Sequence, residues 1–269
     1  MLHNLLAFGG GFMKRKERKF GSNNSAQLLI VAALAIAILI SATTAYVYEL
    51  GKETNGTYNL PISDFVFAIK QTTRNAVISS LANVSNGGEK TLLATNLNEL
   101  SQILRNLKQF GIWQLSFAVL DNLVYDSGIW LSWGTSGIGV SSAYADFTLR
   151  AYDIAMNSTV NYAVNVTTTI TVSGYYTTIL GIEKVVNLTC NVYNEGEPAL
   201  AQNITLFYEN LGIWVPIDSS NNFSITDYGN GTYAISFIVT TLSNTVQVSA
   251  HLRDLRGIIV QANMTCYEG

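Results

Sequence analysis

One apolar segment constrains this chain more than any other feature. Residues 26–48, AQLLIVAALAIAILISATTAYVY, contain no charged residue and no proline. At about 1.5 Å per residue, a helix of this length spans about 34 Å, enough to cross a hydrocarbon core of about 30 Å. The run is too long for the apolar region of a secretory signal peptide. It therefore predicts a transmembrane helix, and the alternative is a buried helix of a globular domain.

The flanks of this segment predict its orientation. Residues 14–19, KRKERK, hold five basic side chains and one acidic one, whereas Glu49 and Glu53 follow the apolar run. Lys and Arg beside a membrane segment stay on the cytoplasmic side. The sequence thus predicts a cytoplasmic basic leader at 1–25, a single-pass helix at 26–48 with the lipid bilayer as its partner, and an extracellular remainder. Met13, directly before the basic run, is a candidate for the true start.

The charge balance beyond residue 48 excludes one class of function. This part holds 17 of the 18 acidic residues and 10 of the 15 basic ones, a net charge of −7. Only 12% of the whole chain is charged, and Ser, Thr, Asn and Tyr take the place of charges. That share is about half the usual one for a soluble globular chain. Because no basic stripe is present, a nucleic-acid partner is excluded.

Two helices and a strand pair are expected after the membrane segment. Apolar residues recur at every third or fourth position over 63–84 and 92–110, which predicts two amphipathic helices. From residue 141 to about 176 apolar and polar residues alternate, and two such runs predict an antiparallel strand pair. The segment 112–139 fits neither period. Its three tryptophans are candidates for the core or for an aromatic surface: Trp113, Trp130 and Trp133.

The rest of the chain predicts an all-β unit. Seven strand candidates, separated by turns rich in Gly and Asn, follow at roughly ten-residue spacing, which is typical of a sandwich. They cover residues 184–193, 203–209, 213–217, 222–226, 232–239, 245–253 and 257–265. The expected organisation after the transmembrane helix is therefore an α+β region at 49–180 and an all-β sandwich at 181–269.

The N-terminal pattern resembles a known leader. KRKERKFG followed by SNNSAQLLIVAALAIAILI is similar to an archaeal class III signal peptide, the leader of type IV pilin-like and archaellin-like proteins. The resemblance implies cleavage after Gly21, with Ser22 as the new N-terminus, and a helix that stays in the membrane or packs into a filament core. Pilin-like subunits or envelope proteins are the implied partners. Bacterial pilins carry Glu at the fifth mature position, which is Ala26 here, so filament assembly stays open.

A turn in the C-terminal part carries a second resemblance. Residues 227–233, DYGNGTY, resemble the D-x-G-x-G-T-Y turn of filamin-like and other immunoglobulin-like domains. The resemblance implies an immunoglobulin-like sandwich over 181–269. In that fold Tyr233 opens a late strand and its hydroxyl binds back to the preceding loop. The position two residues after Tyr233 is Ile235, not the cysteine of an antibody domain.

The two cysteines are candidates for a disulfide. Cys190 and Cys266 both lie on the predicted outer side, where such bonds persist. Closing a loop of about 75 residues contributes roughly 4 kcal/mol in the chain-entropy model. Two buried free thiols are the alternative. His3 and His251 are predicted on opposite sides of the membrane, so the cysteines and histidines form no zinc site.

The commonest chemical motif is Asn-x-Ser/Thr, the acceptor of an N-linked glycan. We expect several of these sites to be occupied, and the alternative is that they reflect composition alone. Glycan would help to keep a weakly charged surface in solution. On the predicted outer side of the membrane the motif occurs at Asn55, Asn83, Asn157, Asn165, Asn187, Asn203, Asn222, Asn230 and Asn263.

Signatures of catalysis are absent from the sequence. Neither G-x-S-x-G nor H-E-x-x-H occurs, so we predict no enzyme, catalytic residue, cofactor or resident metal. Asp218, Asp227 and Asp254 stand at loop ends and together suggest a calcium site, but turn chemistry explains each of them equally well. The sequence therefore favours a pilin-like structural protein of the cell surface. The alternative is an adhesin or ligand-binding module on the same single-pass anchor.

The predicted topology can be tested on intact cells. Protease added from outside should remove an epitope fused after Gly269 and leave a reporter fused before Met1 intact, because only the former lies outside. Immunoblots for both tags measure this, and lysed cells, in which both tags are digested, serve as the control. Digestion of the N-terminal reporter alone would contradict the orientation.

Overall fold

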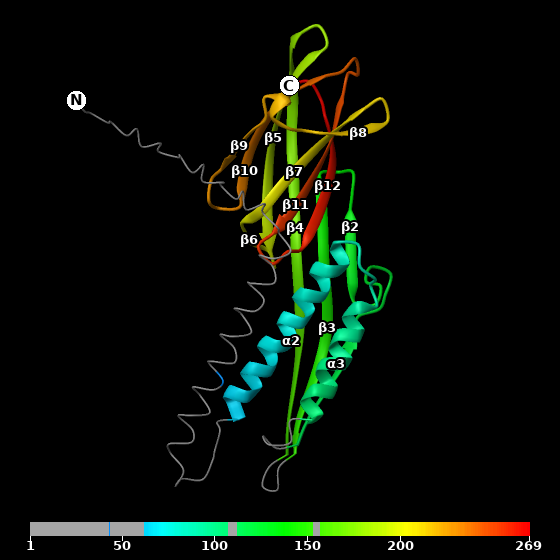
Figure 1. Cartoon of the computed structure of the whole chain (residues 1–269), viewed down its shortest axis with the longest axis vertical. Coiled ribbons are helices and arrows are strands. Elements are labelled where there is room, and N and C mark those ends of the chain that lie inside the picture. The colour runs from blue at the N-terminus through cyan, green and yellow to red at the C-terminus, as the bar shows by residue number, and fades with distance from the viewer. Residues whose placement is uncertain (1–42, 44–61, 107–111, 153–156) are drawn as a thin grey trace, which may run out of the picture. The chain divides into compact units, whose positions relative to one another are not determined.

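The computed structural model describes residues 43, 62–106, 112–152 and 157–269. Residues Pro61–Gly269 form one compact unit, and its described part is mostly β, with two α-helices and two sheets (Figure 1). The predicted membrane helix at 26–48 lies outside the described residues, apart from Thr43, and so does the predicted leader. Among the described helices, none is both long and apolar enough to cross a membrane.

The two expected helices are confirmed. Helix α2 covers Ile62–Ser85 and helix α3 covers Leu92–Asn106. The predicted continuation of the second helix to residue 110 falls in 107–111, outside the described residues. The apolar stripe of α3 is buried, and both helices pack on one face of the larger sheet.

The larger sheet has eight strands in the order β1-β3-β4-β5-β10-β9, with β2 beside β3 and β6 beside β5. All neighbours are antiparallel, including the predicted pair β3 and β4. The segment that fitted neither period forms β1 and β2. The strands are β1 (Ile112–Val119), β2 (Ile129–Trp133), β3 (Ile138–Tyr152), β4 (Asn157–Leu180), β5 (Glu183–Asn194), β6 (Glu197–Pro198), β9 (Ser224–Asp227) and β10 (Thr232–Thr240).

The smaller sheet has four strands in the order β12-β11-β7-β8 and packs on the upper half of the larger one, as Figure 1 is drawn. The two sheets share one hydrophobic core. All seven strands expected beyond residue 181 are present. Those of the smaller sheet are β7 (Ala201–Asn210), β8 (Ile213–Pro216), β11 (Val246–Asp254) and β12 (Ile259–Cys266).

The tryptophans divide between core and surface. Trp113 is 8% exposed and its ring centroid lies 4.3 Å from that of Phe65 on α2. Trp133 is 37% exposed and donates its indole N–H to the Ser141 hydroxyl. Trp130 is half-buried. The core interpretation therefore holds fully for Trp113 alone.

Strand β4 organises the unit, because it runs through both cores. Its 24 residues extend over about 80 Å at roughly 3.3 Å per residue. Val164 and Val166 lie in the core beneath the helices, whereas Ile170 and Val172 lie in the core between the two sheets. The domain boundary predicted after residue 180 falls in the turn between β4 and β5, but β4 itself belongs to both halves.

The opposite side of β4 belongs to what we call the open face of the larger sheet. Side chains alternate along a strand, so the odd-numbered residues of β4 point away from both cores, and all of them are exposed or half-buried. None is charged. In the described part of β4 they are Thr159, Asn161, Ala163, Asn165, Thr167, Thr169, Thr171, Ser173, Tyr175, Thr177 and Ile179.

A buried carboxylate marks the place where the two cores meet. Asp254, at the end of β11, has no exposed surface. Its carboxylate accepts hydrogen bonds from Thr168 Oγ1 on β4 at 2.9 Å and from Arg256 Nε at 2.8 Å. The backbone N–H groups of Arg256 and Ile258 complete the set, each at 2.9 Å. The turn between β11 and β12 is thereby fixed to the middle of β4.

The same cluster reaches helix α2 through two further charges, Glu195 and Arg74. Arg256 Nη1 donates to Glu195 Oε1 at 2.6 Å, and Arg256 Nη2 donates to the carbonyl of Thr167 at 3.1 Å. Glu195 Oε2 lies 3.6 Å from Arg74 Nη2 on α2. The cluster of Asp254, Arg256, Glu195 and Arg74 therefore joins α2, both sheets and the turn after β5.

Removing the buried charge should destabilise the whole unit. Asp254→Asn leaves the guanidinium of Arg256 without its buried partner, and losing one member of such a pair costs about 3–5 kcal/mol. Urea unfolding of the detergent-solubilised chain, followed by tryptophan fluorescence, measures this. Asp126→Asn is the matched control, because it breaks the exposed ion pair with Lys90 and should leave the midpoint unchanged. Equal midpoints for both variants would contradict the assignment.

Candidate functional site

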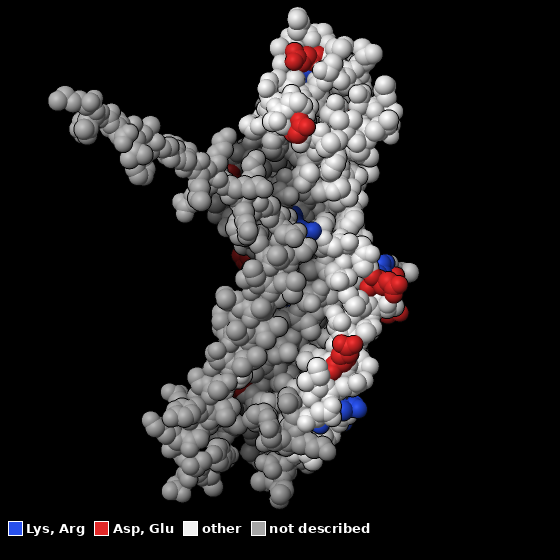
Figure 2. All heavy atoms as spheres, viewed as in Figure 1, with Lys and Arg blue, Asp and Glu red and all other residues white. Residues whose placement is uncertain are grey.

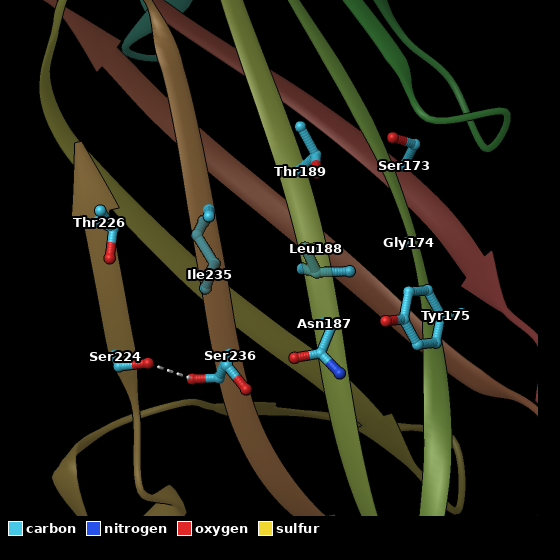
Figure 3. A pocket seen from close by; sticks show the side chains of 11 residues that line it. Ser173, Gly174, Tyr175, Asn187, Leu188, Thr189, Ser224, Thr226, Ile235 and Ser236 are labelled. Atoms are coloured by element: carbon cyan, nitrogen blue, oxygen red, sulfur yellow. Dashed lines mark hydrogen bonds between the residues drawn. The ribbon is translucent and has the colours of Figure 1, made fainter. Parts of the chain in front are cut away.

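A groove of about 570 Å³ lies on the open face, across β4, β5, β10 and β9 (Figure 3). The strand register forms it from two parallel rows of residues. Each row runs across all four strands and takes one residue from each. Backbone at Gly174, Leu188 and Ile235 forms the floor between the rows. The first row is Tyr175, Asn187, Ser236 and Ser224, and the second is Ser173, Thr189, Ala234 and Thr226.

The lining of the groove is polar without being charged. Hydroxyls and one amide dominate, and Tyr175, 49% exposed, supplies an aromatic ring at one side. Such groups hydrogen-bond neutral polar ligands and stack on flat ones, but they contain no paired acid and base for catalysis. Of these residues the sequence singled out only Asn187. The alternation in β4 was the available signal for the rest, since it separates the wet face from the core.

A second hollow, of about 270 Å³, lies between α2 and β4. Its lining includes Lys70, Arg74, Tyr162 and Asn165. Lys70 Nζ lies 5.2 Å from the centroid of the Tyr162 ring, whose hydroxyl lies 3.2 Å from the Thr73 hydroxyl. Burial raises the pKa of the Tyr162 phenol, which therefore stays neutral. These contacts show that the side chains lining this hollow pack helix α2 against strand β4, so no ligand is needed to explain them.

The predicted glycosylation sites are spread over the surface rather than gathered in one place. Asn83, Asn165, Asn203, Asn222 and Asn230 are exposed, and Asn187 and Asn263 are half-buried. The two others are not seen in full: Asn55 lies outside the described residues, and so does the side chain of Asn157, the first residue of β4. The predicted cleavage site at Gly21 and Ser22 lies outside them too. Occupancy and cleavage therefore stay predictions.

Both cysteines are buried free thiols in the structure. Cys190 on β5 and Cys266 on β12 come from the two sheets and belong to the same core. Burial raises the pKa of each thiol to about 12. The free thiols match the alternative that the sequence left open, and the disulfide between them stays a prediction.

The three aspartates weighed as a calcium site have separate structural roles. Asp218 caps the short turn at Ser219–Asn221, Asp227 accepts a hydrogen bond from the N–H of Gly229, and Asp254 belongs to the buried ion cluster. Across the described ranges no group of three His, Cys, Asp or Glu side chains could hold a metal ion. Turn chemistry and ion pairing thus explain these residues.

The hydroxyl of Tyr233 makes a different contact from the expected one. It accepts a hydrogen bond of 2.8 Å from the N–H of Ala201 at the start of β7, and so links the larger sheet to the smaller one. The preceding loop is held by its own side chains instead. Asp227 Oδ1 accepts from the N–H of Gly229 and Asn230 Oδ1 from that of Thr232.

Comparison with known proteins places the chain in no family. No family model, no curated protein and no solved structure matches it.

Alkylation distinguishes the free thiols of the structure from the predicted disulfide. A thiol with a pKa of about 12 holds almost no thiolate at pH 8, and the thiolate is the reactive form. The folded chain should therefore not react with iodoacetamide. In guanidinium without reductant, mass spectrometry should find two alkylated cysteines. Alkylation that requires a reductant would instead establish the disulfide.

Proposed function

We propose that this chain is a membrane-anchored, pilin-like structural protein of the cell surface. Its extracellular body would be an immunoglobulin-like sandwich continuous with a helix-covered sheet, and it would carry N-linked glycan. The observation that supports this most directly is the length of β4. One strand connects the end of the unit where the chain enters to the end farthest from that entry.

The contacts of α2 identify the entry end. The ring of Phe65, near the start of α2, lies tilted against that of Trp113, which pairs with Ala151 near the end of β3. The turn between β4 and β5 lies at the other end of β4, roughly 80 Å away at 3.3 Å per residue. A chain anchored just before α2 would hold that turn well away from its anchor, as a stalk or filament subunit does.

The surface chemistry agrees with an extracellular, glycan-covered body. On the face shown in Figure 2, acidic and basic side chains form a few small, scattered groups on a largely uncharged surface. The open face of β4 is also uncharged along its described length. Glycan on the exposed acceptor asparagines would supply the hydration that charges provide in other soluble bodies.

The groove on the open face favours a second candidate, a ligand-binding module or adhesin on the same anchor. Its volume lies within the range of about 300–1,000 Å³ that is usual for ligand-binding clefts. In this role the groove would take a neutral ligand from outside the cell. The structural role and the binding role share the predicted topology and differ in what the loss of the chain does to the cell.

Immunogold microscopy with an antibody against residues 181–269 tests the proposal. Gold should label the cell surface, and deletion of the gene should remove surface filaments that the full-length gene restores. Ile38→Arg places a charge at the centre of the anchor, which costs about 2.5–3.5 kcal/mol there, and should abolish the surface label. Ile38→Leu is the matched control.

Label confined to the cell interior would overturn the proposal. Surface label without filaments, together with lost adhesion after deletion, would select the binding module.

A further inference from the structure

We propose that the groove on the open face is the seat of a neutral N-linked glycan attached to Asn187 of the same chain. The inference rests on the proposed function, because it requires a glycosylated surface protein. It goes beyond that function in assigning one glycan a defined place on the sheet, with named contacts.

The register places Asn187 inside the groove. Asn187 pairs with Tyr175 on β4 and with Ser236 on β10, and the Cβ atoms of directly opposed residues lie about 4.5–5.5 Å apart. Thr189, which completes its glycosylation motif, lies in the second row of the same groove. Within the described part of the chain, no residue hydrogen-bonds the side-chain amide of Asn187, so its nitrogen is available for attachment.

The attachment itself is an ordinary group transfer. The donor is a lipid-phosphate-linked oligosaccharide. The Asn187 amide nitrogen loses a proton and bonds the anomeric carbon of the first sugar, while the lipid phosphate leaves with the electrons of the bond that breaks. Because the attachment atom lies in the groove, the first sugar must start there.

The surrounding side chains fit a sugar ring. Figure 3 shows the ring of Tyr175 reaching across from β4 toward Asn187 on β5. An exposed aromatic ring packs against the C–H face of a pyranose, and the hydroxyls of Ser236 on β10 and of Ser224 and Thr226 on β9 line the same groove on the other side of Asn187. The absence of charge among the residues that line the groove favours a neutral sugar over an acidic one.

Asn203 provides a matched comparison on the other sheet. It carries the same kind of motif on β7 and is exposed, but its amide nitrogen donates to the Thr205 hydroxyl at 3.3 Å. It does not line the groove. A glycan there is expected to project into solvent, with no effect on Tyr175.

A double-mutant cycle on the full chain, made in a host that N-glycosylates exported proteins, tests the seat. The four proteins are the wild type, Tyr175→Ala, Asn187→Gln and the double variant. Glycopeptide mass spectrometry should find Asn187 occupied in the first two. Tyr175→Ala should lower Tm by about 2–4 °C when the glycan is present, since an aromatic packing contact of ordinary size has that effect on a unit of about 200 residues. In the Asn187→Gln background the shift should largely vanish.

The cycle with Asn203→Gln is the control, and there Tyr175→Ala should keep its full effect. An unoccupied Asn187 beside occupied sites elsewhere would overturn the seat while leaving the proposed function intact. If Tyr175→Ala lowered Tm equally with and without the Asn187 glycan, the seat would likewise be overturned and the proposed function left intact.

Chain glycosylated at Asn187 supplies the last arm. If it bound soluble neutral oligosaccharides and Tyr175→Ala abolished that binding, the groove would be a receptor site open to free ligand, and the seat would be overturned. A chain found inside the cell, with no glycan on any asparagine, would overturn the seat and the proposed function together.

Discussion

Both hydrophobic cores depend on the alternation of side chains along β4. The same side of this strand faces the helices at Val164 and the smaller sheet at Ile170. Because the side-chain period of a strand is two, a slip of one residue would turn both cores outward together. The open-face residues would then be buried, and their hydroxyls and amides would lack partners. One register of β4 therefore has to bury apolar residues against both the helices and the smaller sheet. This requirement couples the folding of the two cores.

The only polar side chain on the covered side of β4 between Val164 and Val172 is Thr168, and it stands where the two cores meet. Its hydroxyl donates to Asp254, whose charge is compensated by Arg256. A buried carboxylate is tolerated there because every side of it has a donor. Hydrogen bonds and an ion pair therefore hold the place where the two cores meet. Apolar packing alone is not directional and would fix the geometry of this junction less closely.

The open face carries polar side chains because it is not covered by either core, and the proposed glycan would lie on it. Small hydroxyl side chains let this face stay hydrated without charge, and the groove lies where four strands present such residues in register. Tyr175 is the exception in size, and it stands directly opposite the half-buried acceptor Asn187. The proposed glycan on Asn187 would therefore begin beside this ring, and it would supply hydration that the weakly charged surface lacks.

The sequence by itself determined the elements and the faces they bury. Three-to-four periodicity located both helices, alternation located the strands from residue 141 onward, and the turn before Tyr233 located a strand start. It did not locate β1 and β2. Trp133 stays partly exposed, and the apolar residues of that segment pack against different elements, so they follow no single period. Of the groove it indicated only Asn187.

Only the tertiary structure decided which elements are neighbours: β4 in both cores, Asp254 on Thr168, Tyr233 on Ala201 and Tyr175 beside Asn187. The physical reason is that periodicity is a local property that fixes the inward side of each strand. Pairing and register depend on contacts between distant residues, and these are chosen by the burial of the whole unit at once.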